Sequence, residues 1–266
     1  MYRKLIQKSI TLILAVVILT GTAMGARVQI NGVHLTDAEG WIRNGVSYVM
    51  LRAVEREGGY DLSWDGRSAR LAGGGAELTA KPGASYIEVN GRALYVKGGV
   101  QTVNGRTVLP MRVLGDALGA EVNWNGKTAT ASMNTTNAKA RSANYSTEDL
   151  YWLSRVISAE SRGESLRGQI AVGNVVLNRV KSQQFPNSVK GVVFDRKNGV
   201  QFEPVENGTI YQEPATTSIL AAKMVLEGTD MVGNCLYFFA PALSKGTWIV
   251  QNRTYYTTIG CHKFYL

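Results

Sequence analysis

Histidine and cysteine are both scarce in this chain, which has two of each among its 266 residues. The histidines, His34 and His262, lie in opposite halves of the sequence. A catalytic zinc site needs about three protein ligands and usually takes them from histidine, cysteine and carboxylate side chains. We therefore expect no metal site and no cofactor.

Long apolar runs are missing as well. The most apolar stretch, Ile10–Leu19, has ten residues, too few to span a bilayer comfortably. Basic residues precede it and the small residues of Ala23-Met-Gly25 follow, which is the order of an export signal. We predict that residues 1–26 are a signal peptide, that the chain is secreted, and that it meets a membrane only through this segment. An uncleaved membrane anchor is the alternative.

Both cysteines, Cys235 and Cys261, lie near the C-terminus. An even pair in an exported protein is most simply a disulfide, so we predict that they are bonded to each other. The chain-entropy estimate for a loop of this length is about 3–4 kcal/mol of stabilisation. Free thiols are the main alternative. A catalytic thiol at Cys261 partnered by His262 is disfavoured, because the two residues are adjacent and neighbouring residues of a strand point to opposite faces.

Acidic residues are outnumbered, since 29 Lys and Arg stand against 20 Asp and Glu, a formal charge of +9. Residues 1–146 carry 17 basic and 10 acidic side chains, and the remainder carries 12 and 10. No basic run occurs, so nucleic acid is a poor partner for an exported chain. The charge instead suits attraction to anionic cell-wall polymers outside the membrane.

An internal duplication is visible at an offset of 60, where residues 44–71 match residues 104–131 without a gap. Each copy combines an Asn-Gly hairpin turn, a short helix stopped by glycine, and a strand. The shared residues are Asn44-Gly45, Arg52, Gly59, Trp64, Gly66 and Ala69, repeated as Asn104-Gly105, Arg112, Gly119, Trp124, Gly126 and Ala129. We therefore predict a compact α+β module built from two hairpin/helix/strand units.

The predicted helices are Leu51–Glu57 and Met111–Leu118, and the strands that follow them end at Trp64 and Trp124. A tryptophan on an alternating strand usually belongs to the core, so we expect both indoles to be buried. Sugar-stacking platforms are the alternative function for these two side chains.

The duplicated region resembles the copper amine oxidase N-terminal-like domain over Val28–Met133, through its Asn-Gly, Pro110-Met-Arg112 and Trp-(Asp/Asn)-Gly signatures. The resemblance implies a stalk, a spacer or a wall-binding module. Copper binding is not expected, because this region has one histidine, His34, and no cysteine. We assign residues 27–133 to this domain and the polar residues 134–145 to a linker.

A second domain, residues 146–266, opens with a capping-box pattern at Ser146 and a helical apolar stripe that includes Val156 and Ile157. Glu160 falls one turn beyond this stripe, at the edge of the expected core. Burial disfavours the charged form of a carboxylate, so such a group can hold a proton near neutral pH and act as a general acid. A solvated helix-end residue is the alternative for Glu160.

Further helices are predicted around Ile170–Val180 and Ala215–Leu226. The last part of the chain is aromatic and β-like. Its expected strands are Leu236–Phe239, Trp248–Val250, Tyr255-Tyr256 and His262–Tyr265. The fold class is therefore α+β, with helices first and an aromatic-rich β part last in this domain.

Residues 145–266 resemble the SleB/CwlJ-type cell-wall hydrolase family in six ordered groups of motifs. These are Ala159-Glu160-Ser-Arg162-Gly163-Glu164, Gly168–Val172, Leu177-Asn178-Arg179-Val180, Phe185-Pro186, Gln201-Phe202, and the C-terminal set Tyr237-Phe238, Trp248 and Gly260-Cys-His262-Lys-Phe264. The resemblance implies a lysozyme- or transglycosylase-like catalytic domain that cuts the glycan strand of peptidoglycan in the wall or spore envelope. It also implies Glu160 as the catalyst.

The resemblance suggests further residues around that catalyst. Glu164, Gln201, Phe202, Tyr237 and His262 are the substrate-binding candidates, although each could equally be a packing residue. Hydrolysis would need a second carboxylate, and Glu164 is the one nearby in sequence, but we favour a structural or positioning role for it. An N-acetylmuramoyl-L-alanine amidase and a non-catalytic wall-binding protein are the alternative functions. Vegetative wall and spore cortex both remain open as targets.

Overall fold

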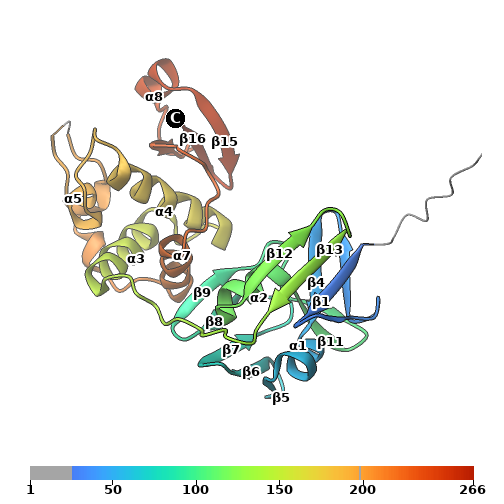
Figure 1. Ribbon diagram of the computed structural model, residues 1–266. Helices are drawn as coiled ribbons and strands as arrows, with labels where there is room; N and C mark the ends of the chain where they lie inside the picture. The colour runs from blue at the N-terminus through green and yellow to red at the C-terminus, as the bar shows by residue number, and fades with distance from the viewer. Residues whose placement is uncertain (1–25, 198) are drawn as a thin grey trace, which may run out of the picture.

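The computed structural model describes residues 26–197 and 199–266. The predicted signal peptide therefore lies, apart from its last residue, outside the described residues. Within the described part of the chain, no helix is both long and apolar enough to cross a bilayer. The chain divides into a β-rich N-terminal half and a C-terminal half in which helices dominate (Figure 1), so the α+β class is confirmed.

The N-terminal half contains three sheets and two helices. Its elements are β1 Arg27–Ile30, β2 Val33–His34, β3 Gly40–Arg43, β4 Val46–Met50, α1 Leu51–Gly58, β5 Asp61–Trp64, β6 Ala69–Gly73, β7 Ala76–Ala80, β8 Tyr86–Val89, β9 Arg92–Tyr95, β10 Gln101–Val103, β11 Arg106–Pro110, α2 Met111–Leu118, β12 Glu121–Asn125 and β13 Thr130–Asn134. The sheets have the strand orders β12-β13-β1-β2, β10-β11-β4-β3 and β5-β6-β7-β8-β9. Strand β1 pairs with β13 in parallel, which joins the two ends of this half.

Four Asn-Gly turns connect neighbouring antiparallel strands, and two of them are the turns predicted at Asn44-Gly45 and Asn104-Gly105. The asparagines have φ between 49° and 52° and the glycines between 72° and 83°, the left-handed values that a two-residue hairpin turn requires. Helices α1 and α2 follow β4 and β11 directly. Each ends at a left-handed glycine, Gly59 and Gly119, whose N–H caps the helix.

The two tryptophans do not lie in the core, contrary to the prediction. Leu62 and Val122 pack against the core from β5 and β12, whereas Trp64 and Trp124, two residues further along, are 56% and 53% exposed. Both strands are sheet edges, and the indoles extend past the rim of the core.

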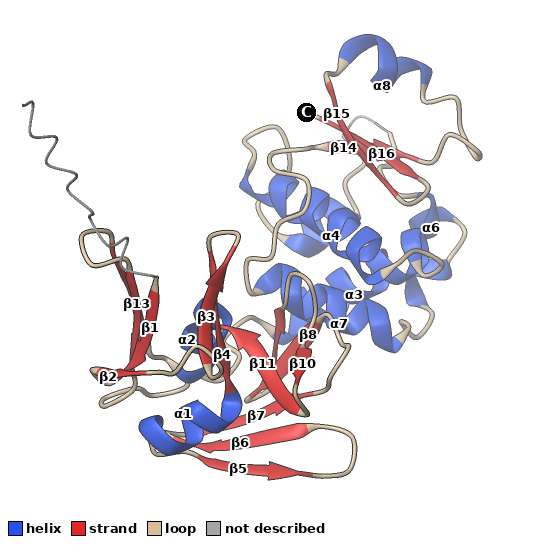
Figure 2. Cartoon of the chain, turned by 90° about the vertical axis from the view of Figure 1, so that its right-hand side faces the viewer, coloured by secondary structure: helices blue, strands red, loops and turns tan. Residues whose placement is uncertain are grey.

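The C-terminal half places a small sheet against a group of helices (Figure 2). Its elements are α3 Thr147–Ser161, α4 Leu166–Lys181, α5 Val189–Val193, α6 Glu203–Glu206, the 3-10 helix η1 Thr209–Tyr211, α7 Thr216–Leu226, β14 Tyr237–Phe239, α8 Thr247–Asn252, β15 Tyr255–Ile259 and β16 His262–Tyr265. Helices α3, α4 and α7 pack on one another, and the sheet has the order β14-β16-β15. The strand predicted at Trp248–Val250 is wrong, because these residues form α8, which starts after the left-handed Gly246.

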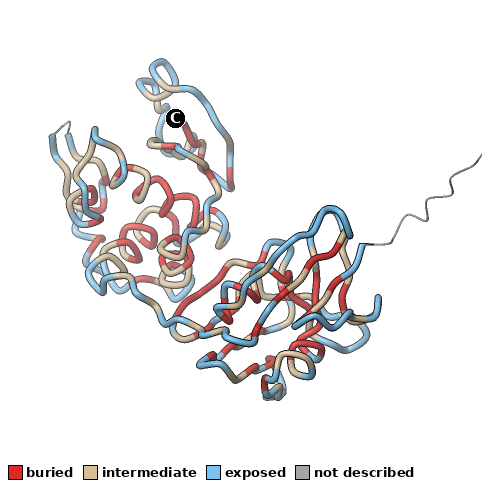
Figure 3. Tube along the Cα trace, in the orientation of Figure 1, coloured by how far each residue is buried: buried red, intermediate tan, exposed pale blue. Residues whose placement is uncertain are grey.

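The two halves meet through β9 and α7, which pack side by side (Figure 1). Arg92 on β9 is fully buried, and its Nη2 lies 2.9 Å from a carboxylate oxygen of Glu227, which follows α7 and is 2% exposed. Arg141 from the intervening segment approaches the same oxygen at 2.7 Å. Many residues of both β9 and α7 are buried at this contact (Figure 3).

The segment predicted as a linker follows the surface of the N-terminal half. Ala140 donates its N–H to the carbonyl of Gly74 at 3.1 Å, and Ala143 donates to Asn90 at 3.3 Å. Asn134 belongs to β13 rather than to this segment. The connection is therefore tied down at several points along its length.

Candidate active site

Helix α3 carries the predicted catalytic residue in its last turn. Its N-cap is Ser146, whose hydroxyl accepts the N–H of Asp149 at 2.9 Å, and acidic residues in the first turn suit the helix dipole. Val156 and Ile157 are fully buried, so this face of the helix is fixed in the core. Glu160 follows one turn later and is partly buried, at the border between core and solvent.

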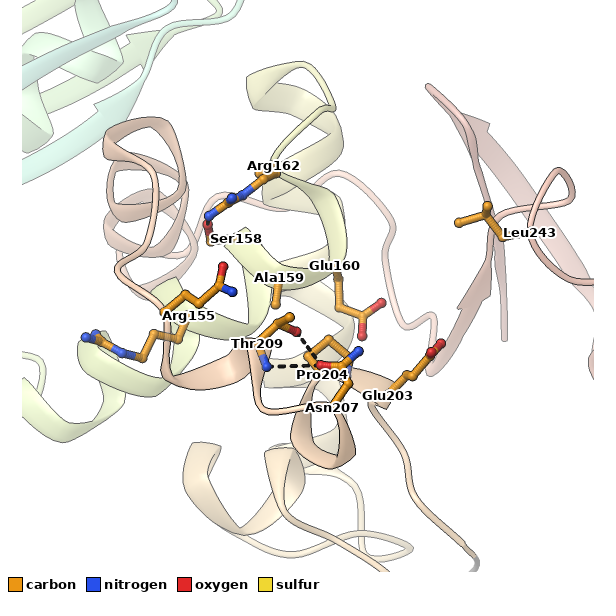
Figure 4. Close-up of a pocket in the computed structure, with 11 residues that line it drawn as sticks. Arg155, Ser158, Ala159, Glu160, Arg162, Glu203, Pro204, Asn207, Thr209 and Leu243 are labelled. Carbon is orange, nitrogen blue, oxygen red and sulfur yellow. Dashed lines mark hydrogen bonds between the residues drawn. The ribbon is translucent and has the colours of Figure 1, made fainter.

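Glu160 lines a pocket of about 320 Å³ between α3 and the segment from α6 to η1 (Figure 4). The lining residues are Arg155, Ser158, Ala159, Glu160, Arg162, Glu203, Pro204, Asn207, Thr209, Gln212 and Leu243. Figure 4 shows the carboxylates of Glu160 and Glu203 both directed into this space, from α3 and α6 respectively. Leu243 approaches from the opposite wall, on the loop between β14 and α8.

The pKa of Glu160 is raised from 4.5 to about 7, mainly by burial. The negative charge of Glu203 contributes to this rise, while the positive charge of Arg179 opposes it. A carboxyl group with such a pKa is partly protonated at neutral pH, which is the state a general acid needs.

The opposing positive charge is that of a buried arginine outside the lining of the pocket. Arg179 is 5% exposed, and its Nε donates to the carbonyl oxygen of Leu236 at 2.8 Å. Its guanidinium lies 4.9 Å from the ring centre of Phe185 and 5.3 Å from that of Phe202. Burial lowers the pKa of Arg179 to about 10, so the side chain still carries its charge at neutral pH.

Glu164 lies outside this pocket. Its carboxylate accepts the N–H of Cys261 at 3.2 and 3.3 Å, in the turn between β15 and β16. The fit is tight enough that a Cβ on Gly260 would come within 1.7 Å of a Glu164 oxygen. His262 Nδ1 is 3.8 Å from the same carboxylate. The position of Glu164 is that of a residue that anchors the C-terminal sheet to the helices.

The four other substrate-binding candidates are also absent from the described lining of the pocket. Phe202 is 2% exposed and Tyr237 is partly buried, and both rings lie near Arg179. Gln201 donates to the carbonyl of Gly199 at 3.1 Å. His262 is 7% exposed beside Phe238, and burial lowers its pKa. These residues therefore do not belong to the lining of the pocket around Glu160.

The predicted disulfide is not present, because Cys235 and Cys261 are both free thiols. Cys235 is completely buried in a cluster with Val172 and Val175, and burial raises the pKa of its thiol to about 11. Cys261 is exposed on the β15–β16 turn, where the Glu164 carboxylate raises its thiol pKa. One thiol is enclosed by the core and the other faces solvent, which explains why they do not pair. Neither environment favours a thiolate nucleophile.

Glu203 is the residue that sequence reasoning missed. It is exposed at the start of the four-residue helix α6, where Pro204 favours helix initiation. The motif Gln201-Phe202 ends immediately before it, so that motif was the available signal. Folding of the loop, rather than spacing along α3, brings Glu203 toward Glu160.

Comparison with known proteins gives two family matches. The family described as cell wall hydrolase matches residues 163–265, and the copper amine oxidase N-terminal domain matches residues 29–133. The first range begins three residues after Glu160.

Individual relatives point to the same family. The spore cortex-lytic enzyme of Bacillus cereus is 40% identical over 120 residues, which is 45% of this chain and 45% of that enzyme. The cell wall hydrolase CwlJ of Halalkalibacterium halodurans is 31% identical over 99 residues, 35% of this chain and 68% of that protein. The solved catalytic domain of the germination-specific lytic transglycosylase SleB from Bacillus anthracis is 38% identical, with a TM-score of 0.43, over 47% of this chain and all of that one. The chain thus spans less than half the length of the cortex-lytic relative.

Proposed function

This chain belongs to the cell wall hydrolase family, and on that premise we propose that it cleaves the glycan strand of peptidoglycan with Glu160 as the catalytic acid. The observation that carries the proposal is a carboxyl group with a pKa raised to about 7 in a pocket between two helical segments. Peptidoglycan is the proposed substrate, and no cofactor takes part in the reaction.

The reaction begins with the protonated form of Glu160. It donates its proton to the glycosidic oxygen between muramic acid and glucosamine as the bond to the muramic C1 breaks. The resulting carboxylate takes the proton of the muramic C6 hydroxyl, and the C6 oxygen closes a bond to C1. The products are an anhydro-muramic end and a free glucosamine hydroxyl, and Glu160 is protonated again. This lytic transglycosylase reaction needs one carboxyl group and no water.

Hydrolysis is the second candidate, because Glu203 offers a second carboxylate in the same pocket. In glycosidases a second carboxylate can activate water or attack the sugar carbon, with the outcome set by the separation of the two groups. Glu164 is less suited to that task, since its oxygens are engaged at the β15–β16 turn. Phe202 and Tyr237 would act indirectly, by holding Arg179 near Glu160.

We also propose how the chain is organised for this task. Residues 1–26 direct export, residues 27–133 form a stalk of two repeats, residues 134–145 connect, and residues 146–266 form a lysozyme- or transglycosylase-like catalytic domain. The ranges of the two family matches support the division between the halves. The site of action is the cell wall or the spore envelope.

Digestion of purified peptidoglycan with wild type and Glu160→Gln tests the function. Wild type should release muropeptides with anhydro-muramic ends, and Glu160→Gln should release none while its circular dichroism and unfolding remain those of a folded protein. Glu206→Gln is the matched control, because Glu206 lies on α6 and is exposed outside the lining of the pocket.

The products also separate the rival functions. Reducing muramic ends in place of anhydro ends would identify a hydrolase. Free stem peptides with intact glycan would identify an amidase, although the catalytic half has only one histidine, His262. Sedimentation with the wall without any released product would identify a binding protein. Parallel digestion of vegetative wall and spore cortex identifies the preferred target.

A further inference from the structure

Two exposed indoles occupy equivalent positions in the N-terminal half. Trp64 ends β5 and Trp124 lies near the end of β12, and they are related by the same offset of 60 as the two sequence copies. Each is more than half exposed, at 56% and 53%. Figure 1 places β5 at the lower edge of this half and β12 on its upper side. The two indoles thus occupy separate sheets.

Each indole borders a surface hollow that is lined by polar and basic groups. The hollow beside Trp64 has a volume of about 210 Å³ and includes Arg52 and Arg106. The hollow beside Trp124 has a volume of about 440 Å³ and includes Arg27 and Asn123. Both sites therefore combine a flat apolar surface with hydrogen-bond donors and positive charge.

The same turn supports both indoles. After Trp64, the Asp65 carboxylate accepts the N–H groups of Arg67 and Ser68 at 2.9 and 2.8 Å. After Trp124, the corresponding Asn125 side chain accepts the N–H groups of residues 127 and 128 at 3.0 and 3.2 Å. Residues 67 and 127 are an exposed Arg and an exposed Lys. Each turn thus presents an aromatic ring and a cation on a hydrogen-bonded base.

Packing does not explain why both copies have tryptophan here. The exposed neighbours differ between the copies, with Ser63 replaced by Asn123 and Asp65 by Asn125, whereas the indole is the same. A buried residue is restricted by its neighbours, but these indoles project beyond the core. Single exposed apolar side chains are common, but two at equivalent positions, each beside a polar hollow, require another reason.

We propose that Trp64 and Trp124 are the platforms of two equivalent binding sites for sugar rings of a glycan polymer. The apolar C–H face of a sugar stacks on an indole, while its hydroxyls take hydrogen bonds from the surrounding polar groups. The nearby cations pair with carboxylates of the stem peptides. Peptidoglycan as the ligand rests on the proposed function, because it is the polymer that the catalytic half would cut.

A repeating polymer explains why two sites are present. Once one sugar is bound, the second site meets further units of the surrounding glycan network at a high effective concentration. Two weak sites on one module then retain the enzyme on the wall more strongly than either site alone. The N-terminal half is accordingly a bivalent glycan-binding module.

Co-sedimentation of the full chain with purified sacculi tests this proposal. The Glu160→Gln background keeps the polymer intact, and sacculi stripped of anionic polymers isolate the glycan. Trp64→Ala and Trp124→Ala should each weaken the apparent affinity about tenfold, the effect of losing an aromatic anchor. The double variant should lose more than either single variant. Trp64→Phe and Trp124→Phe should recover part of the binding, since a flat ring remains.

Val33→Ala and Val46→Ala are matched controls, because these exposed apolar residues lie on β2 and β4 of the same half, outside both hollows. Unchanged binding by the double tryptophan variant would overturn the proposal. Loss of all binding when anionic polymers are stripped would also overturn it and would identify those polymers as the ligand. Because no cleavage is measured, this result is independent of whether the wild type cuts glycan or peptide bonds.

Discussion

Glu203 on α6 faces the same pocket as Glu160 on α3, and its negative charge adds to burial in raising the pKa of Glu160. A negative charge in the same pocket disfavours the ionised form of Glu160, and protonation of Glu160 removes the repulsion. The positive charge of Arg179 limits this rise in the pKa of Glu160. The balance holds the pKa of Glu160 at about 7, in the range where one carboxyl group can serve as acid and then as base.

Removal of the Glu203 charge should move the pH profile of activity. Without that charge the pKa of Glu160 falls, so activity that requires protonated Glu160 should decline at a lower pH in Glu203→Gln than in wild type. Rates of sacculus lysis measured from pH 5 to pH 9 give the midpoint of this decline.

Glu206→Gln is the control for that profile, because it removes an equal charge from the same helix outside the pocket lining. A profile that moves equally in both variants would show that the general charge of α6, rather than the facing carboxylate, sets the pKa. An increased proportion of anhydro ends in Glu203→Gln would assign Glu203 to water activation.

Glu160 should also make stability depend on pH. The folded protein holds the proton up to about pH 7, whereas the unfolded chain releases it near 4.5, so folding stability falls as pH rises through this window. A shift of this size corresponds to roughly 3 kcal/mol. Glu160→Gln should therefore match wild type near pH 4 and exceed its stability by up to that amount above pH 7. Urea unfolding across this range measures the difference, and a constant difference at all pH values would contradict the raised pKa.

The ion pair between Arg92 and Glu227 should contribute strongly to the stability of the folded protein. Both side chains are almost fully buried, so Arg92→Met leaves the Glu227 carboxylate with only the half-exposed Arg141 as its partner and should lower the free energy of unfolding by up to about 3–5 kcal/mol. Arg70→Met is the control, because the Arg70–Asp65 pair has the same 2.9 Å separation but is exposed. This substitution should lower the free energy of unfolding by about 1 kcal/mol or less.

A second substitution separates charge burial from packing at this contact. Arg92→Met/Glu227→Met removes both buried charges and leaves Arg141, which is half-exposed and can be solvated, so the double variant should recover much of the loss. Thermal unfolding of the single and double variants compares the two effects. A double variant as unstable as Arg92→Met would mean that shape, rather than the unpaired charge, is responsible.

The two thiols should react very differently. Cys261 is exposed and should be modified in the native protein by a thiol reagent, whereas Cys235 should react only after unfolding, since it is enclosed and the pKa of its thiol is raised to about 11. Reductant should leave the melting temperature unchanged. Mass spectrometry of the labelled native protein counts the modified sites. If the native protein is not labelled and its melting temperature falls in reductant, the two cysteines form a disulfide.

The local features of the fold were accessible from sequence because each depends on neighbours along the chain. The Asn-Gly turns require left-handed backbone at both residues, which these residue types adopt readily, and all four form hairpins. The start of α3 follows from the side chain of Ser146. The partial burial of Glu160 follows from its position one helical turn after the buried Val156 and Ile157.

The features that were not predicted depend on contacts between distant segments. Glu203 joins the site only because α6 packs against α3. Glu164 is occupied by the β15–β16 turn, 97 residues away in sequence. Trp124 looked like a core residue because its strand alternates, but the core ends at Val122, and the sequence pattern does not show where a layer stops.

Because β9 packs on α7 and residues 140 and 143 are hydrogen-bonded to the N-terminal half, that half stands at a set distance and angle from the pocket. On the proposed function, a molecule whose N-terminal half is bound to the wall would then reach only the bonds within a fixed distance of its binding point. After cutting them it would have to detach and settle elsewhere. The cleaved bonds would accordingly lie in separate small groups across the peptidoglycan rather than in one continuous line.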